Sequence, residues 1–276
     1  MDDKLWEPKR RLELQFQKAL SEIGNHMHES IDGMADPFDI LATVKSLLKN
    51  MVFHRYADAT AEKMVAGIFS AGKQTWRMAA RENSNSRLIY EALRRELEGP
   101  VGGSVAFQIQ RNAEIIKSFP LDIAKQMTDY ISDETIKGRR SAAIAEDLIL
   151  RFPDVTKNKA KLIARTEVSK TSTALTQARC ESIGLDWYRW RSSEDGRVRD
   201  SHRLMDGVLV RWTDPPSPER LDGLKNPPAP YHAGNIYNCR CYPEPVVNLD
   251  YVKWPAKVFR NGAITMMTRS QFEQAA

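Results

Sequence analysis

The first 185 residues show one helical periodicity after another, and this pattern constrains the fold more than any other feature. In residues 9–30, apolar side chains recur at spacings of three and four, as they do on one face of an amphipathic helix. Asp36, Ser141 and Thr156 belong to the residue types that cap helix starts, and Gly99 and Gly184 to those that follow helix ends. Further helices are therefore predicted over residues 38–81, 86–98, 104–117, 120–136, 141–152 and 156–183.

Two glycines interrupt the longest of these predicted helices. Gly67 and Gly72 lie inside residues 38–81, and they indicate either a break or a point of tight packing. The apolar stripes of so many helices exceed what one core of a 276-residue chain absorbs, so we expect some of them to dock on a partner.

The composition changes at about residue 185. The segment 186–193 is rich in aromatic residues and alternates like a strand, and a second short strand is predicted in residues 208–212. Prolines then concentrate in residues 214–238, which read as turns and irregular loop. The predicted fold class is α+β and predominantly α: a helical body followed by a small, loop-rich C-terminal lobe that contains β-structure.

Composition excludes several classes of protein. No apolar run approaches the roughly 20 residues that span a bilayer, and the first ten residues contain no apolar signal-peptide core. The three cysteines are too few for a disulfide scaffold and are typical of a reducing compartment. We therefore expect a soluble, intracellular, globular protein without a membrane partner.

The net charge of +5 is mild, and the basic residues form only small clusters. These clusters predict weak, salt-sensitive contact with DNA phosphates, without sequence reading. The alternative is a solvated surface with local ion pairs, and it is the commoner explanation for such clusters. The candidate nucleic-acid-binding residues are Lys137, Arg139, Arg140, Arg197 and Arg199.

The C-terminal lobe gathers residue types that bind metals. His202, His232, Cys239 and Cys241 could supply the four nitrogen and sulfur ligands of a structural zinc ion, and a lobe with few aliphatic residues needs such help to stay folded. A single residue separates the two cysteines, which is closer than the usual zinc spacing. Two small buried thiols beside a hydrogen-bonded histidine remain the alternative.

Other chemistry finds weaker support in the sequence. Cys239 or Cys241 with His202 and Asp200 could imitate a nucleophile–histidine–acid arrangement, but nothing in the sequence forces these side chains together. Cys180 falls in a predicted helix and is interpreted as a core thiol. No phosphate loop, dinucleotide fingerprint or zinc-protease motif is present. No catalytic residue is therefore predicted.

The order of short motifs resembles one known family. Residues 163–168 read IARTEV, residues 195–202 read DGRVRDSH, Asp206-Gly207 follows, and residues 238–241 read NCRC. This succession resembles the phage Mu F-like minor head protein family, also called phage head morphogenesis proteins, over about residues 105–247. The residues that carry the motifs are Arg165, Thr166, Glu167, Asp195, Arg197, Ser201, His202, Asp206, Gly207, Asn238, Cys239, Arg240 and Cys241.

The resemblance implies a domain organisation. It predicts a helical N-terminal region over residues 1–103 that makes partner contacts, and a head morphogenesis domain over residues 104–247. The domain divides into a helical part, residues 104–184, and a lobe, residues 185–247. Residues 248–276 form a C-terminal tail.

The resemblance also implies a function. It predicts a non-enzymatic minor capsid protein of a tailed bacteriophage, acting in procapsid assembly at or near the portal vertex and in DNA packaging or ejection. The implied partners are the portal protein, a major capsid or scaffolding protein and packaged double-stranded DNA, and the implied locations are the virion and, during assembly, the host cytoplasm. The alternatives are a metal-dependent nuclease or toxin-like enzyme that uses the His/Cys lobe, and a DNA-binding adaptor.

Overall fold

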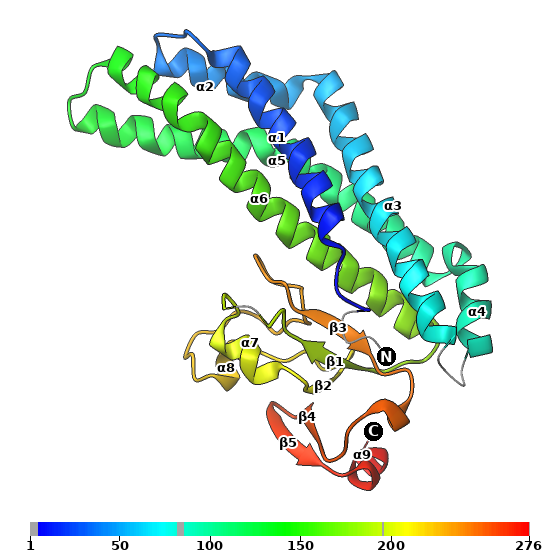
Figure 1. The fold of residues 1–276 in the computed structure, drawn as a ribbon. Coiled ribbons are helices and arrows are strands. Elements are labelled where there is room, and N and C mark those ends of the chain that lie inside the picture. Colours follow the sequence, from blue (N-terminus) through cyan, green and yellow to red (C-terminus); the bar gives the residue numbers. More distant parts are fainter. Residues whose placement is uncertain (1–4, 82–85, 195, 276) are drawn as a thin grey trace. The chain divides into compact units, whose positions relative to one another are not determined.

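The computed structural model describes residues 5–81, 86–194 and 196–275, and its first part is entirely helical (Figure 1). These helices are α1 (Arg10–Ile31), α2 (Pro37–Ser46), α3 (Met51–Arg81), α4 (Ser86–Arg94), α5 (Pro100–Ile136) and α6 (Ser141–Ser182), with 3-10 turns at Leu47–Lys49 and Glu96–Glu98. The predicted α+β class with a predominance of helix is confirmed, because strands occur only after α6. Within the described ranges, every helix is too short or too polar to span a bilayer.

Strands and short helices alternate after α6. They are β1 (Trp187–Arg191), α7 (Asp200–Met205), β2 (Leu209–Arg211), α8 (Pro218–Leu221), β3 (Tyr242–Pro245), β4 (Ala256–Arg260), β5 (Ala263–Met267) and α9 (Arg269–Ala275), with a 3-10 turn at Leu249–Tyr251. The two strands predicted from the aromatic segments are confirmed as β1 and β2, and the proline-rich residues 214–238 contain only the short helix α8.

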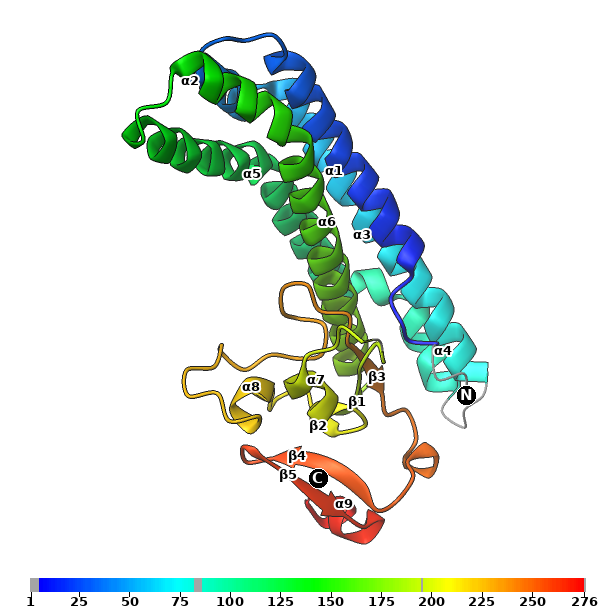
Figure 2. The same ribbon diagram turned by 60° about the vertical axis from the view of Figure 1, so that its left-hand side comes forward.

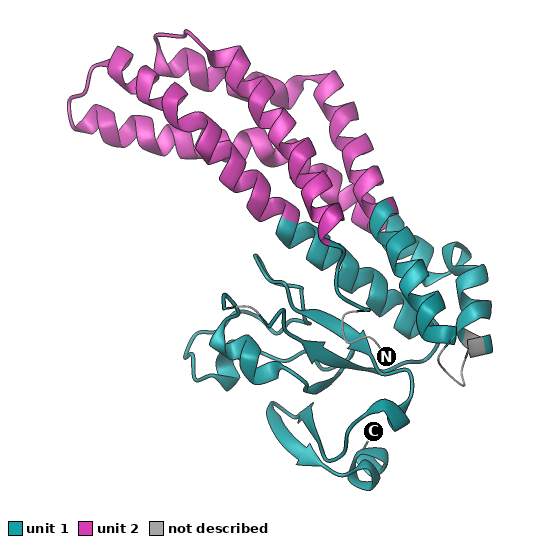
Figure 3. Cartoon of the chain, in the orientation of Figure 1, with its two compact units in different colours: residues 1–9, 67–106, 165–276 teal, residues 10–66, 107–164 magenta. Residues whose placement is uncertain are grey.

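The chain forms two compact units (Figure 3). Unit 1 consists of residues 1–9, 67–106 and 165–276, and unit 2 of residues 10–66 and 107–164. Helices α3, α5 and α6 each contribute to both units. The domain division at residues 103, 184 and 247 follows motif similarity rather than compactness, and it stays a prediction.

Unit 2 is a set of four long helical segments whose neighbours are joined in a closed ring. Tyr56 of α3 donates a hydrogen bond to Glu22 of α1, and two ion pairs join α3 to α5 and α5 to α6. A Cβ atom on Gly24 of α1 would lie 2.9 Å from the Thr156 side chain of α6, so that side chain packs directly against the α1 backbone. The ion pairs are Lys117–Asp58 and Lys159–Asp122.

The apolar stripe of α1 faces the inside of unit 2. Phe16, Leu20, Met27 and Ile31 are each at most 2% exposed. We expected some apolar helix stripes to dock on a partner. The stripe of α1 needs no such partner, because it is already buried within unit 2. Asp36 caps α2 as predicted, since its carboxylate accepts hydrogen bonds from the backbone N–H groups of Phe38 and Asp39.

Three predicted helix boundaries are wrong. The break in residues 38–81 lies at Leu47–Asn50, where the Asn50 side chain caps α3, and not at the glycines. Pro120 and Pro153 lie inside continuous helices, because a proline removes only one backbone donor and buried neighbours hold both halves together. Thr156 is no helix cap, since its hydroxyl donates to carbonyl groups of the preceding turn.

A five-stranded sheet forms the centre of the lobe in unit 1, in the order β3-β1-β2-β4-β5. β1 is antiparallel to both β2 and β3, β2 is parallel to β4, and β4 and β5 form a hairpin. On β1, Tyr188 and Trp190 are fully buried while Trp187, Arg189 and Arg191 are half-buried, as the alternation predicts.

The segment that the sequence presents only as a C-terminal tail completes this sheet. β4, β5 and α9 lie together (Figure 2), and Phe272 of α9 packs 4.8 Å from the Trp187 ring and 5.2 Å from the Trp254 ring. These aromatic contacts pack the chain after Pro245 against the sheet.

Candidate metal centre

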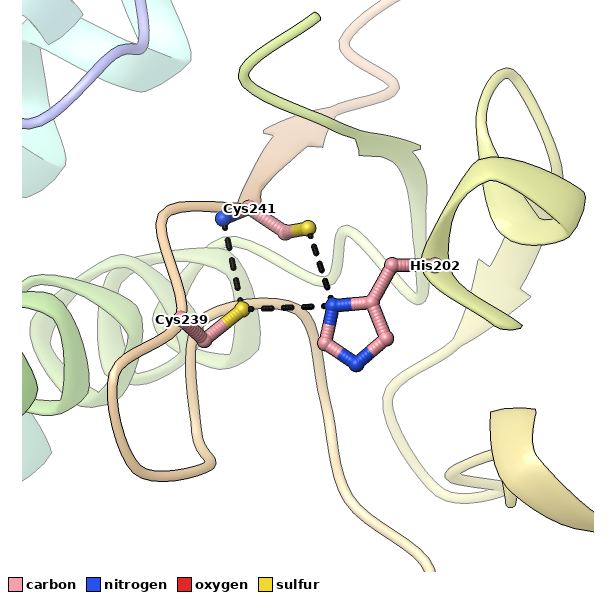
Figure 4. Close-up of side chains that lie close together, drawn as sticks. All are labelled: His202, Cys239 and Cys241. Atoms are coloured by element: carbon pink, nitrogen blue, oxygen red, sulfur yellow. Dashed lines mark hydrogen bonds between the residues drawn. The ribbon is translucent and has the colours of Figure 1, made fainter. Parts of the chain in front are cut away.

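Two thiols and one imidazole converge in the lobe (Figure 4). His202 lies on α7, and Cys239 and Cys241 lie on the loop before β3. The Nδ1 atom of His202 is 3.5 Å from Cys239 Sγ and 3.3 Å from Cys241 Sγ, and all three ligand atoms lie within 4.8 Å of one another. Each of the three side chains is at most 3% exposed. The structure therefore brings together three of the four predicted ligands.

The loop that carries the cysteines is fastened to α6. The hydroxyl of Thr166 accepts a hydrogen bond from the backbone N–H of Asn238, and Arg165 donates to the Asn238 side chain, each at 2.9 Å. Further along α6, Thr173 donates to the carbonyl of Ala233 at 2.7 Å. The motif around Arg165 thus contacts the motif around Cys239 directly, across more than 70 residues of sequence.

A chain of hydrogen bonds determines which ring nitrogen of His202 carries the hydrogen. Tyr231 donates its single hydroxyl proton to Glu219 Oε1 at 2.6 Å, because a carboxylate only accepts. The Tyr231 oxygen is 2.9 Å from His202 Nε2 and must therefore accept a proton from that nitrogen. In the neutral imidazole, Nε2 then carries the hydrogen and Nδ1 presents its lone pair to the two sulfur atoms.

The electrostatics of the two thiols are unequal. The Cys241 thiol donates toward Cys239, which lowers the pKa of Cys239 and raises that of Cys241, and burial raises the pKa of Cys241 further. The backbone N–H of Cys241 also donates to Cys239 Sγ at 3.3 Å. Burial and the hydrogen bond to Glu219 raise the pKa of Tyr231. The phenol therefore stays protonated and keeps its place in the chain from Glu219 to His202.

His232 does not join this group. Its Nδ1 atom is 3.1 Å from the hydroxyl of Tyr188, and its ring packs against Trp212 at 5.1 Å. The aromatic residues of β1 and of the segment just after β2 thus hold His232 away from the sulfur atoms, although it lies only one residue beyond Tyr231. Burial lowers the pKa of His232 to about 4, and a hydrogen bond to the backbone of Trp212 opposes part of this shift.

This buried histidine predicts a pH dependence of stability. The pKa of His232 in the unfolded chain is the ordinary value of about 6.5. Between pH 6.5 and about 4, His232 therefore binds a proton in the unfolded chain but not in the folded chain. Stability is full above pH 6.5 and falls by about 3 kcal/mol as the pH drops to 4. His232→Gln is expected to flatten this slope in urea unfolding measured from pH 7 to 4. His26, exposed on α1, gives the control His26→Gln, and equal slopes for the two variants would contradict the prediction.

The acid proposed for a nucleophile–histidine–acid arrangement lies elsewhere. Asp200 is paired with Arg203 at 2.6 Å, and its side chain is 81% exposed. The carboxylate nearest His202 is Glu219, 3.6 Å from Nε2. Neither Glu219 nor the part played by Tyr231 was predicted from the sequence. The neighbouring Tyr231-His232 pair was a weak signal for the tyrosine, whereas Glu219, on α8, stands in a proline-rich segment of sequence without any pattern.

The basic clusters are engaged with neighbouring groups. Arg139 bonds to Glu134 and Asp147 at 2.8 and 2.6 Å, and Lys137 bonds to Glu134 at 2.7 Å. Arg199 donates to the Tyr237 carbonyl and lies over the Tyr237 ring. Arg140 and Arg197 are exposed. Local pairing compensates much of this charge, and the weak contact with DNA stays a prediction.

The remaining motif residues lie around the centre. Asp206 accepts a hydrogen bond from the backbone N–H of Ser192 at 2.7 Å, and Gly207 adopts a φ of +77° and donates its N–H to the Trp190 carbonyl. Ser201 and Glu167 are buried, Arg240 is half-buried, and Asp195 lies outside the described residues. The motif residues with described contacts thus connect β1, α7, α6 and the cysteine loop.

These features define a class: an α+β chain in which a long helix anchors a His/Cys loop beside a small mixed sheet. Residues 122–243 match the family model described as Phage Mu protein F like protein, so this part of the chain is similar to the phage Mu F-like family. The resemblance predicted from the motifs is confirmed, and the matched residues include α7 and both cysteines.

Comparison with other proteins adds one relative. An uncharacterized protein of Haemophilus influenzae is 33% identical over 140 residues, which make up 50% of this chain and 28% of the relative. The chain thus spans less than a third of the length of that curated relative. No solved structure matches the chain.

Proposed function

We propose that this chain is a phage head morphogenesis protein: a non-enzymatic minor head protein that acts in procapsid assembly and becomes part of the virion. The observation that carries the proposal is the family match over residues 122–243. It covers the whole of the α6 helix and the lobe as far as the start of β3, the part of the chain in which the motif residues contact one another.

The contacts of the motif residues support a structural role. Arg165 and Thr166 hold Asn238, and Asp206 holds the backbone of Ser192. These bonds connect segments of the chain instead of presenting free groups to a substrate. A metal-dependent nuclease or toxin would need an accessible centre, whereas His202, Cys239 and Cys241 are almost completely covered by protein.

The finer proposal concerns place and partners. We infer a position at or near the portal vertex, with contacts to the portal protein and to a major capsid or scaffolding protein. Contact with packaged double-stranded DNA is weak, because the net charge is only +5 and Arg139 and Lys137 are paired locally. A protein that holds DNA loosely suits a particle from which the DNA must leave.

The test is quantitative mass spectrometry of density-purified procapsids and mature particles from the replicon that encodes the chain. A few copies per particle are expected, above the level of host proteins that merely contaminate the preparation. Co-expression with the portal protein of the same replicon is expected to give a complex that survives size-exclusion chromatography. Absence of the chain from both kinds of particle would contradict the head-protein proposal.

A further inference from the structure

We propose that His202, Cys239 and Cys241 bind one zinc ion, with His202 Nδ1 and the two sulfur atoms as ligands and without His232. The distances agree with a tetrahedral site. Zinc bonds of about 2.3 Å to sulfur and 2.0 Å to nitrogen place the two kinds of ligand atom roughly 3.5 Å apart. The observed Nδ1–Sγ distances are 3.5 and 3.3 Å.

Hydrogen bonding alone explains the cluster less well. Nδ1 of His202 has one lone pair, and the sulfur atoms of both cysteines approach it within hydrogen-bonding distance. If Cys241 donates to Cys239 and Cys239 donates to Nδ1, the Cys241 sulfur, 3.3 Å from Nδ1, approaches the nitrogen without a hydrogen bond, whereas a cation at the centre satisfies both sulfur atoms and the nitrogen together. The chain from Glu219 through Tyr231 places the hydrogen of the neutral imidazole on Nε2, so that the Nδ1 lone pair faces the two sulfur atoms.

The surroundings have the features of a zinc site. A zinc-bound histidine usually donates its other N–H group to a carboxylate, a backbone carbonyl or water. His202 donates to Tyr231, and Tyr231 in turn donates to the Glu219 carboxylate. Two thiolates and an imidazole are the soft and borderline donors that select zinc over magnesium or calcium. The backbone N–H of Cys241, which donates to Cys239 Sγ, also supports a thiolate there.

The charge balance favours a divalent ion. On binding, both thiols lose their protons to solvent, so that Zn²⁺ and two thiolates together carry no net charge. A neutral centre suits a place where each of the three side chains is at most 3% exposed. The ion would join α7 to the loop before β3 in a lobe that otherwise relies on aromatic packing.

Metal analysis of the full chain, purified under reducing conditions without chelator, tests the proposal. About one zinc per chain is expected. After the zinc is stripped, cobalt(II) is expected to restore binding and to give the strong visible absorption of a tetrahedral site with thiolate ligands. Less than a tenth of an equivalent of zinc, together with no cobalt spectrum, would overturn the proposal.

Variants locate the ion. Cys239→Ser and Cys241→Ser are each expected to abolish the thiolate–cobalt absorption, while Cys180→Ala leaves it unchanged, because Cys180 is buried in α6 outside the cluster. Circular dichroism of each stripped variant shows whether it is folded.

Tyr231 acts through His202 as a positioning residue, so Tyr231→Phe is expected to weaken cobalt binding about 10–100-fold and to keep its spectrum. Binding that survives both serine substitutions, or that His232→Gln abolishes, would contradict the ligand set. These outcomes do not depend on the head-protein proposal.

Discussion

Replacing Arg179 by methionine is expected to lower the free energy of unfolding by about 3–5 kcal/mol. The Arg179 guanidinium donates from Nε to Glu96 at 2.9 Å and from Nη2 to the Phe69 carbonyl at 3.0 Å, and it lies over the Phe69 ring. Both partners of the ion pair are less than 5% exposed. Methionine fills much of the space but leaves Glu96 buried, with Lys73, at 3.3 Å, as its remaining counter-charge among the described residues. Urea unfolding followed by tryptophan fluorescence and circular dichroism measures the loss.

Two comparisons separate the buried charge from the lost packing. The double variant Arg179→Met with Glu96→Gln is expected to recover much of the loss, because no uncompensated carboxylate then remains. Arg203→Met removes an exposed ion pair with Asp200, and it is expected to cost at most about 1 kcal/mol. A loss of less than 1 kcal/mol for Arg179→Met alone would show that Glu96 finds water or another partner.

The sequence could not predict this ion pair. Arg179 and Glu96 are separated by 83 residues, and each stands in a helical segment where a charged residue is ordinarily solvated. Gly72 was the one usable signal. A Cβ atom there would lie 2.3 Å from Arg179 Nη1, so the tight-packing alternative is right for Gly72, and the helix continues through it.

Helical periodicity predicted the elements better than it predicted their ends. The stripe of α1 and the alternation of β1 place apolar residues at spacings that hold only in a helix and in a strand, and both predictions are confirmed. Pro120 misled as a predicted helix start, and the break predicted between residues 152 and 156 does not occur, because tertiary packing preserves one long helix in each case. The strands β4 and β5 were not predicted, since what orders them is pairing with β2 and with each other.

The candidate site was predictable by residue type and not by geometry. Cysteine and histidine in an aliphatic-poor lobe indicated a metal, and the structure places His202 with both cysteines. His232 was included because the sequence offered no fourth ligand closer at hand, but Tyr188 and Trp212 engage its ring. Which histidine faces the sulfur atoms depends on how β1 and α7 pack, and no local pattern encodes that.

Gly234→Ala is expected to destabilise the protein by about 2–4 kcal/mol. Gly234 has a φ of +82°, which costs an L-residue free energy, and an added Cβ atom would lie 2.7–2.8 Å from three oxygen atoms. Two are the hydroxyls of Thr173 and Ser169 on α6, and the third is the backbone carbonyl of Cys241. The Ser169 hydroxyl can rotate away, but the Thr173 hydroxyl would lose its hydrogen bond to the Ala233 carbonyl, and the Cys241 carbonyl moves only with the loop. Urea unfolding with a chelator present measures the loss without a contribution from any bound metal.

Gly223→Ala isolates the steric part of this effect. Gly223 also has a positive φ, +92°, but no atom lies within 4 Å of its added Cβ, so its replacement is expected to cost only about 1–2 kcal/mol of backbone strain. A larger loss for Gly234→Ala than for Gly223→Ala shows that the close approach of α6, Gly234 and Cys241 contributes to stability. Any shift of the Cys241 carbonyl also moves its thiol, so metal affinity is expected to fall in Gly234→Ala and to stay unchanged in Gly223→Ala. Equal stability and equal cobalt binding in the two variants would mean that the cysteine loop is not held in place by its contact with α6.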